Sequence, residues 1–201
     1  MKKVTVPLEN RSYDILIGEN LISNFPIYLE KLLSRRIIAI VTDKNIENLH
    51  LSKLVDVLSE AGIETKVLVI NPGESNKSWE TLQTTVDWML ANKIERNDIV
   101  VALGGGVVGD LVGFAAAILR RGIRYIQCPT SLLAQVDSSV GGKTGINTIH
   151  GKNLVCAFYQ PTKVIADIST LNTIKERDFI AGYGEVVKYG LLGDYKFYCW
   201  L

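Results

Sequence analysis

The residues with the clearest potential for chemistry surround three glycines at positions 104–106. An apolar, β-branched run at 99–103 precedes them and an Ala-rich apolar segment at 107–119 follows, which predicts a strand, a tight turn and a helix. Glycines at such a turn let a phosphate approach the helix N-terminus, where free N–H groups and the helix dipole favour an anion. They can equally serve only to tighten the turn. Because the spacing to Gly109 differs from the standard dinucleotide fingerprint, the motif alone leaves both interpretations open.

Isolated charges occur in two later segments. Lys143 and Lys152 lie in a Gly-, Ser- and Thr-rich stretch, 132–153, whose apolar residues are too dense for a linker. Glu185 and Lys188 are three residues apart, so they share one face of a predicted helix. Each lysine taken alone is typical of a solvated surface cation, and Glu185 with Lys188 is typical of a surface ion pair.

The hydrophobic pattern predicts the framework that must position these residues. Alternating apolar residues around a polar turn at 9–12 indicate a hairpin over 3–17. Apolar strands then alternate with helices, which predicts an α/β fold: a Rossmann-like parallel sheet with flanking helices, an N-terminal hairpin, and a ligand site at the carboxyl ends of the strands. Strands are expected at 37–42, 65–70, 99–103, 124–128 and 163–168, and helices at 23–33, 51–61, 78–92, 107–119 and, with glycine breaks, 176–200.

Asp43 stands at the carboxyl end of the strand predicted at 37–42. A carboxylate in that place can accept a hydrogen bond from the ribose of a dinucleotide. It can equally cap the N-terminus of the helix that follows, and the sequence by itself favours the cap.

Composition narrows the class of protein. The chain has 201 residues, of which 47% are hydrophobic and 21% charged, and its net charge of +1 argues against nucleic acid or an anionic membrane as a partner. No apolar run has the length of a signal peptide or a membrane span, so a cytoplasmic protein is expected. The three widely spaced cysteines, Cys128, Cys156 and Cys199, are expected to be reduced core thiols.

Four motifs in sequence order resemble those of one known family. They are GGGVVGD at 104–110, PTSLLAQVDSSVGGKTGIN at 129–147, GKNL at 151–154 and GEVVKYG at 184–190. Together they closely resemble 3-dehydroquinate synthase, and the resemblance runs over essentially the whole chain. It implies a lyase of the shikimate pathway and of aromatic amino acid biosynthesis, which uses NAD and a divalent metal, zinc or cobalt. Such an enzyme converts 3-deoxy-D-arabino-heptulosonate 7-phosphate to 3-dehydroquinate and phosphate, and the intact form is expected to be a homodimer.

The resemblance also implies roles for individual residues. The expected catalytic residues are Asp137, Lys143, Lys152, Asn153 and Lys188. Glu185 is the expected metal ligand, and Asp43 becomes a ribose partner in preference to a cap. The expected NAD-binding residues are Asp43, Pro72, Gly73, Glu74, Ser75, Asn76, Lys77, Gly106, Val107, Val108, Gly109, Asp110, Thr130, Ser131, Lys143, Lys152, Thr170, Leu171, Asn172 and Thr173.

The sequence departs from this family in its length and its histidines. Family members are much longer, and their second, helical domain supplies two histidine metal ligands and further basic residues. The histidines here, His50 and His150, lie elsewhere and are expected at the surface or at caps. We therefore expect an NAD-binding domain at 1–174 and the first part of a helical metal- and substrate-binding domain at 175–201. A catalytic zinc typically needs three protein ligands, so this chain is expected to be inactive by itself.

Three alternatives remain beside the synthase. One is a related sugar-phosphate cyclase, another is a metal-dependent polyol dehydrogenase of similar fold, and the third is a non-catalytic NAD-binding module. The unbroken run at 137–147, together with Lys152 and Asn153, favours the synthase over the first two. The absence of the family's histidines favours the third. The apolar residues at 199–201 predict poor stability or self-association of the chain.

Overall fold

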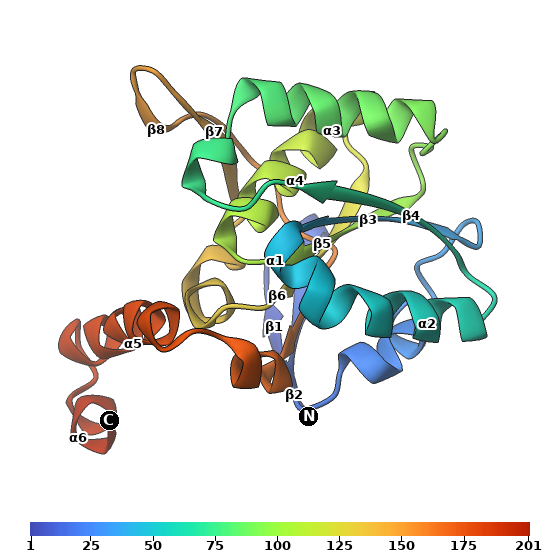
Figure 1. Cartoon of the computed structure of the whole chain (residues 1–201). Helices are drawn as coiled ribbons and strands as arrows, with labels where there is room; N and C mark the ends of the chain where they lie inside the picture. The colour runs from blue at the N-terminus through green and yellow to red at the C-terminus, as the bar shows by residue number, and fades with distance from the viewer.

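The structure, a computed structural model, describes the backbone of residues 1–201 and every side chain except that of Asn10. A seven-stranded sheet in the order β1-β2-β9-β6-β5-β3-β4 forms its centre, with β1 antiparallel and all other neighbours parallel (Figure 1). A second sheet consists of the antiparallel pair β7 and β8. The strands are β1 Lys2–Val6, β2 Tyr13–Gly18, β3 Ile37–Asp43, β4 Glu64–Ile70, β5 Ile99–Gly104, β6 Arg124–Pro129, β7 Lys143–Thr148, β8 Gly151–Phe158 and β9 Lys163–Asp167.

Helices cover both faces of the large sheet, because its central strands are apolar on both sides. Every residue of β5 is buried, as the unbroken apolar run predicts. Helices α3 and α4 pack on one face, and α2 with the 3₁₀ segment η2 packs on the other (Figure 1). The helices are α1 Lys44–Ile46, α2 Ser52–Glu60, α3 Trp79–Ala91, α4 Gly106–Ile118, α5 Glu176–Leu191 and α6 Tyr195–Trp200, and the short helical turns include η2 Ile22–Tyr28, η3 Glu47–Leu51, η4 Glu74–Asn76, η6 Ala134–Ser138 and η7 Ile168–Thr173.

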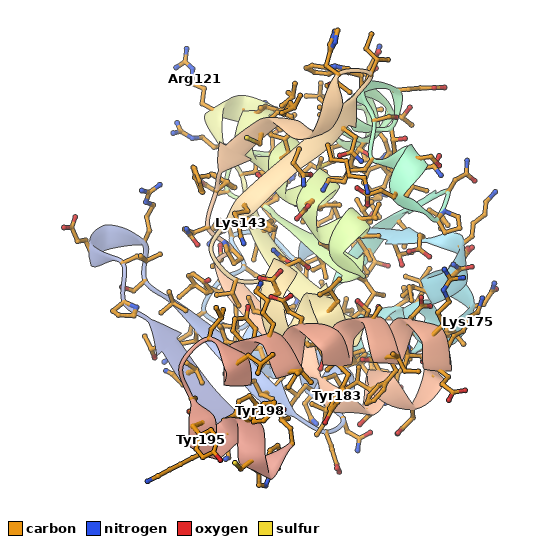
Figure 2. All side chains as sticks on the ribbon, turned by 90° about the vertical axis from the view of Figure 1, so that its left-hand side faces the viewer. Arg121, Lys143, Lys175, Tyr183, Tyr195 and Tyr198 are labelled. Carbon is orange, nitrogen blue, oxygen red and sulfur yellow. The ribbon has the colours of Figure 1, made fainter. Side chains whose placement is uncertain are left out.

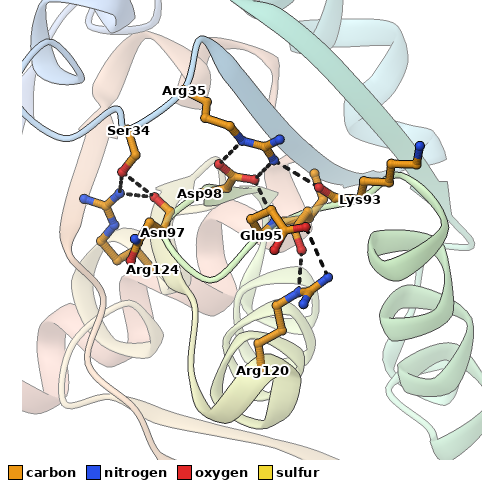
Figure 3. A network of polar contacts seen from close by, with 9 residues as sticks. Ser34, Arg35, Lys93, Glu95, Asn97, Asp98, Arg120 and Arg124 are labelled. Atoms are coloured by element: carbon orange, nitrogen blue, oxygen red, sulfur yellow. Dashed lines mark hydrogen bonds and ion pairs between the residues drawn. The ribbon is translucent and has the colours of Figure 1, made fainter.

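A polar network closes the amino ends of the parallel strands (Figure 3). Asp98, just before β5, has a side chain only 1% exposed, and it pairs with Arg35, just before β3. Its carboxylate also accepts from the Glu95 N–H at 2.7 Å. Arg124 donates to the Ser34 hydroxyl at 3.0 Å and to the Asn97 carbonyl. These bonds hold three neighbouring strand starts in register.

One predicted element differs from the structure, and one stretch for which no element was predicted has regular structure. The helix expected at 23–33 is the shorter 3₁₀ segment η2, because Asn24 has non-helical dihedral angles and Pro26 has no N–H to donate. The Gly-rich stretch after residue 132 is not an irregular loop, since it contains the π-helical turn η6 and continues into the β7–β8 hairpin. The remaining strands and helices of the sheet are confirmed within a few residues.

The expectation of three core thiols is wrong for two of them. Cys128 is buried on β6, where burial raises the pKa of its thiol far above the ordinary value. Cys156 and Cys199 are exposed, because β8 turns one face to solvent and α6 packs chiefly against α5.

The last two helices lie beside the sheet domain and project from it (Figure 1). Helix α5 approaches the body at Gly182, where an added Cβ would lie 2.6 Å from the Leu133 backbone nitrogen. Much of the apolar surface of these helices is exposed, including Tyr183, Tyr195 and Tyr198 (Figure 2). We call this surface the α5–α6 face; its exposed members are Phe179, Ile180, Tyr183, Tyr189, Leu191, Leu192, Tyr195, Tyr198 and Trp200. Within the described residues, no helix has both the length and the apolar character needed to cross a membrane.

Candidate functional site

The predicted ligand-binding edge of the sheet lies at a topological switch point. Strand β3 pairs with β4 on one side and with β5 on the other, so the chain leaves β3 and β5 in opposite directions. Asp43 ends β3 and Gly104 ends β5, and these ends are neighbours. In open α/β sheets the crevice beyond such strand ends is where ligands bind.

The glycine turn between β5 and α4 combines close packing with an open face. A Cβ on Gly104 would lie 2.7 Å from the Val108 side chain, so this glycine is required by the turn itself. Gly105 has an ordinary negative φ of −75° and lines a cleft, where its nearest neighbour is the Ser131 hydroxyl. The helix N-terminus behind it carries free N–H groups that suit an anion. Gly104 therefore serves the tight turn, whereas Gly105 leaves space beside the helix N-terminus, and the phosphate site stays a prediction.

A cleft of about 550 Å³ extends from this turn between the strand ends and the start of α5. We call it the strand-end cleft; its lining residues are Asp43, Asn45, Ile46, Asn48, Leu49, Gly105, Thr130, Ser131, Leu133, Thr173, Ile174, Lys175, Asp178 and Ala181. Four of these, Asp43, Thr130, Ser131 and Thr173, are among the residues expected to bind NAD. The sequence therefore identified separate segments that the fold brings to one cleft.

Asp43 caps the following helix, as the sequence alone favoured. Its Oδ1 accepts from the Asn45 and Ile46 N–H groups at 2.8 and 3.1 Å. No described group bonds to Oδ2, so one carboxylate oxygen stays available on the wall of the strand-end cleft. The cap and the expected ribose contact are compatible.

A second cleft of about 400 Å³ lies between α4 and the β7–β8 hairpin. We call it the hairpin cleft; its lining residues are Asp110, Asp137, Ser138, Lys143, Thr144, Gly145, Asn153, Cys156, Ala157 and Phe158. Four of them were expected at the site: Asp110, Asp137, Lys143 and Asn153. Ser138 was not expected, although it lies within the motif that carried the resemblance. Its hydroxyl comes within 3.0 Å of where a Cβ on Gly106 would stand.

Lys77, Asp110 and Asn153 form a cluster at the inner end of the hairpin cleft. Lys77 is almost fully buried, and its Nζ donates to the Asp110 carboxylate and, at 2.5 Å, to Asn153 Oδ1. Burial raises the pKa of Asp110, and the neighbouring Lys77 ammonium opposes this. Three segments far apart in sequence thus meet in one charged group, of which Lys77 and Asp110 are the less exposed members and Asn153 the exposed one.

The turn at residues 72–77 is fastened to the β7–β8 hairpin by Asn147. The Asn147 amide donates to Glu74 Oε1 at 2.7 Å, and its Oδ1 accepts from the Asn153 N–H at 3.0 Å. The Asn147 N–H also donates to the Lys77 carbonyl at 2.7 Å. Sequence reasoning assigned no role to Asn147, although its place beside the glycine-rich run was the available signal.

The outer part of the hairpin cleft brings Asp137 close to Lys143 and α5. Lys143 Nζ lies 3.8 Å from Asp137 Oδ1, and its side chain is 63% exposed. The Tyr189 hydroxyl donates to the same carboxylate oxygen at 3.3 Å. Figure 2 shows Lys143 on the side of the molecule along which α5 runs. This arrangement leaves Lys143 free to turn toward an anionic ligand.

Glu185 and Lys188 form the ion pair that their spacing predicts, with 2.5 Å between Oε1 and Nζ. The Lys188 ammonium also lies 5.6 Å from the centre of the Tyr189 ring, and its bond to Glu185 raises its pKa. Among the described residues, no three histidine, cysteine, aspartate or glutamate side chains are grouped to hold a metal ion. Glu185 is therefore at most one ligand of a metal site, and the residues described do not complete one.

The other expected residues lie near the two clefts or at their edges. Lys152 is exposed on β8 and makes no hydrogen bond or ion pair with the described side chains. Thr170 is the buried residue of the 3₁₀ segment η7, while Leu171 and Asn172 in the same segment are more exposed. Their contacts with NAD stay predictions.

His50 contradicts its expected place at the surface. It is 8% exposed, and its Nε2 lies 2.9 Å from the Thr173 hydroxyl. The prediction failed because two helical turns that were not predicted, α1 and η3, precede α2, and η3 carries His50 into the protein. His150 is exposed in the turn between β7 and β8, as predicted.

Two solved structures have a similar overall fold. The chain is 32% identical to 2-epi-5-epi-valiolone synthase from Streptomyces hygroscopicus subsp. jinggangensis, solved with NAD⁺ and Zn²⁺; the TM-score is 0.82, over 91% of this chain and 50% of that one. It is 26% identical to a 2-deoxy-scyllo-inosose synthase complexed with carbaglucose-6-phosphate, NAD⁺ and Co²⁺, with a TM-score of 0.83 over 93% of this chain and 50% of that one.

Sequence comparison gives a closer family. The 3-dehydroquinate synthase of Ruegeria pomeroyi is 56% identical over the whole chain, which covers 54% of that enzyme. The chain thus spans about half the length of the curated relatives it matches. A family model described as 3-dehydroquinate synthase N-terminal matches residues 67–181, which is more than half of the chain. The match includes the glycine turn, all the residues that line the hairpin cleft and the whole motif at 129–147. The chain therefore belongs to the 3-dehydroquinate synthase family of lyases.

Proposed function

We propose that this chain is the dinucleotide-binding half of a 3-dehydroquinate synthase, which converts 3-deoxy-D-arabino-heptulosonate 7-phosphate to 3-dehydroquinate and phosphate with NAD and a divalent metal. The observation that carries the proposal is the ion pair of the buried Lys77 with the partly buried Asp110 beside the glycine turn, to which the exposed Asn153 is hydrogen-bonded. A desolvated ion pair is costly to build for stability alone, and such groups concentrate at functional sites.

The strand-end cleft suits the adenosine side of NAD. Gly105 leaves room at the N-terminus of α4 for the pyrophosphate, because only the Ser131 hydroxyl, at 3.4 Å, lies near the place of a Cβ. Asp43 Oδ2 is available to a ribose hydroxyl on the same wall. Thr130 and Ser131 add neutral hydroxyls between these two points.

The hairpin cleft suits the nicotinamide side of NAD and a polyhydroxylated, anionic substrate. When bound, NAD supplies a hydride acceptor for a substrate hydroxyl. Lys143 offers a cation that can leave Asp137 for a phosphate or carboxylate oxygen, because the two are 3.8 Å apart and exposed. Lys77 and Asn153 keep Asp110 fixed at the inner end, where its orientation helps to define the pocket.

We further propose that Glu185 supplies one metal ligand and that the remaining ligands come from a region like the second half of the longer relatives. The incomplete ligand set around Glu185 and the exposed α5–α6 face support this division. The domain limits, residues 1–174 and 175–201, belong to the same proposal, as do a sugar-phosphate substrate and a homodimer in the intact enzyme.

The decisive experiment is a calorimetric titration of the 201-residue chain with NAD. Saturable one-to-one binding is expected. Asp110→Ala and Lys77→Ala should each weaken it by about tenfold or more, because each leaves the other charge buried and unpaired beside the ligand. Lys66→Ala is the matched control, since Lys66 lies on the edge strand β4 and pairs only with Glu64 at the surface.

Circular dichroism accompanies each titration to show that the protein is folded. A folded chain that does not bind NAD, or one whose affinity is unaffected by both cluster substitutions, would overturn the assignment of the dinucleotide site.

A further inference from the structure

His50 is a buried titratable residue that the proposed binding contacts do not use. It belongs to the π-helical turn η3 and follows Leu49, which lines the strand-end cleft. Burial lowers the pKa of the imidazole, so the neutral ring is favoured. A neutral ring has one N–H donor, and the question is where that donor points.

The hydrogen bonds of the Thr173 hydroxyl show which residue donates in the bond between His50 and Thr173. The Thr173 hydroxyl donates its single hydrogen to the Thr170 carbonyl at 2.8 Å. Its oxygen therefore accepts from His50 Nε2–H, at 2.9 Å. The ring is fixed as the Nε2–H tautomer, and the bond joins two segments that are distant in sequence.

These two segments both line the strand-end cleft. Residues from Asp43 to Leu49 contribute one part of its lining, and Thr173, Ile174 and Lys175 contribute another. The second segment also leads directly into α5, which carries Glu185 and Lys188. The His50–Thr173 bond therefore ties the wall beside the predicted ribose partner to the start of that helix.

The N-terminal end of η7 is held by a separate set of hydrogen bonds. Gln135 Nε2 donates to the Asp167 carbonyl at 3.1 Å and to the Thr170 hydroxyl at 3.2 Å. Asp167 in turn accepts from the Ile22 and Ser169 N–H groups. Loss of His50 would thus release the segment after Thr170 without releasing the part before it.

We propose that His50 is a positioning residue for the dinucleotide site, whose Nε2–H bond to Thr173 sets the position of residues 173–175 at the strand-end cleft. This inference rests on the proposed function, because it assigns the cleft to NAD. The residue acts through Thr173 and does not itself touch the ligand.

The test compares His50→Leu, which keeps the size of the side chain and removes the donor, with His50→Gln, which restores an N–H at a similar reach. NAD affinity is measured by calorimetry, and amide hydrogen exchange is followed at Ile174, whose N–H bonds to the Leu171 carbonyl. His50→Leu should weaken NAD binding by about fivefold, the effect of one lost hydrogen bond, and should speed exchange at Ile174. His50→Gln should restore both values to within about twofold of the parent.

His150→Leu is the matched control, since His150 is exposed and its ring makes no contact with the described side chains. Thr173→Val removes the same bond from the other side together with the bond to the Thr170 carbonyl, so combining it with His50→Leu should weaken binding by less than the product of the two single effects. Unchanged affinity and exchange in His50→Leu, or a His50→Gln variant as impaired as His50→Leu, would overturn the inference. If the parent chain does not bind NAD, the proposed function fails, whereas exchange at Ile174 still decides whether His50 holds the segment.

Discussion

The two ends of the central sheet both carry charged side chains, and they use them in opposite ways. At the amino ends, Asp98 is enclosed by Arg35 and the Glu95 N–H, and Arg124 bonds to Ser34 and Asn97 (Figure 3). Every one of these bonds is made to another part of the same chain. The charges therefore stabilise the arrangement of strands and leave little for a ligand to bind.

At the carboxyl ends the same kinds of groups are left partly open. Lys143 is mostly exposed and only loosely paired, and the Asp43 carboxylate uses one oxygen for its cap. The only tightly enclosed pair, Lys77 with Asp110, borders a cleft. Polar groups that the fold satisfies internally contribute to stability, whereas groups that it leaves unsatisfied are the candidates for binding a ligand.

The pKa shifts of Asp98 and Asp110 differ in the same way between the amino and carboxyl ends of the sheet. Burial acts to raise the pKa of Asp98, but the hydrogen bonds from Arg35 and the Glu95 N–H outweigh it, so the pKa lies below its usual value. Burial raises the pKa of Asp110, and Lys77 does not fully offset this. Ionised Asp98 thus favours folding, while ionised Asp110 is held at some cost to folding in the proposed site.

Among the substitutions that test this difference between the two ends of the sheet, Asp98→Ala should have the largest effect. It leaves the buried Glu95 N–H and the Arg35 guanidinium without their acceptor, so the free energy of unfolding should fall by about 2 kcal/mol. Urea denaturation measures this loss. NAD affinity, measured well below the unfolding midpoint, should not change, and a marked loss of affinity in the folded variant would refute the separation of the two ends.

The pH dependence of the unfolding free energy provides a second test of the stabilising role of Asp98. Because the pKa of folded Asp98 is lowered, its contribution to stability is complete above the unfolded pKa of about 4 and is lost as the pH falls through the folded value. The difference in unfolding free energy between the parent and Asp98→Asn should therefore be largest at neutral pH and shrink in acid. Urea titrations between neutral pH and strong acid measure it. Asp87→Asn, at an exposed position on α3, is the control, and a difference that grew in acid would contradict the assignment.

The smallest expected effect is on stability, and it concerns the contact of α5 with the carboxyl-end side of the sheet. A Cβ at Gly182 would lie 2.6 Å from the Leu133 backbone nitrogen, whereas one at Gly184 would meet nothing within 4 Å. Both alanine substitutions raise helix propensity equally, so Gly182→Ala should be less stable than Gly184→Ala by about 1 kcal/mol. Thermal unfolding with hydrogen exchange in α5 measures the difference. Equal stabilities would mean that α5 is not held by this close approach.

Much of the fold follows from local sequence. Residues 99–103 are apolar without alternation, which suffices to place a central parallel strand, and Gly62 and Ser78 mark helix ends that the structure confirms. The shortened η2 segment was missed because apolar spacing outweighed Pro26 in the prediction. The β7–β8 hairpin was missed because its residues, rich in glycine and threonine, lack the apolar alternation of a typical strand.

The residues of the candidate site were likewise predictable only in part. The resemblance identified Asp110, Asp137, Lys143 and Asn153, which the fold brings to one cleft. The bond between His50 and Thr173 could not be foreseen, because it depends on where a π-helical turn directs one ring toward a distant segment. Contacts of that kind are set by tertiary packing, and they leave no periodic signal in either segment.

The pairing of β2 with β9 also has a consequence for the order of events during synthesis. The N-terminal hairpin joins the sheet only through β9, with Asp14 opposite Lys163 and Gly18 opposite Asp167. On the ribosome, β1 and β2 emerge first and can pair with each other, but the other edge of β2 has no partner until β9 leaves the exit tunnel. Until then this edge is unpaired, and completion of the sheet is a long-range step that slows folding and exposes the nascent chain to aggregation.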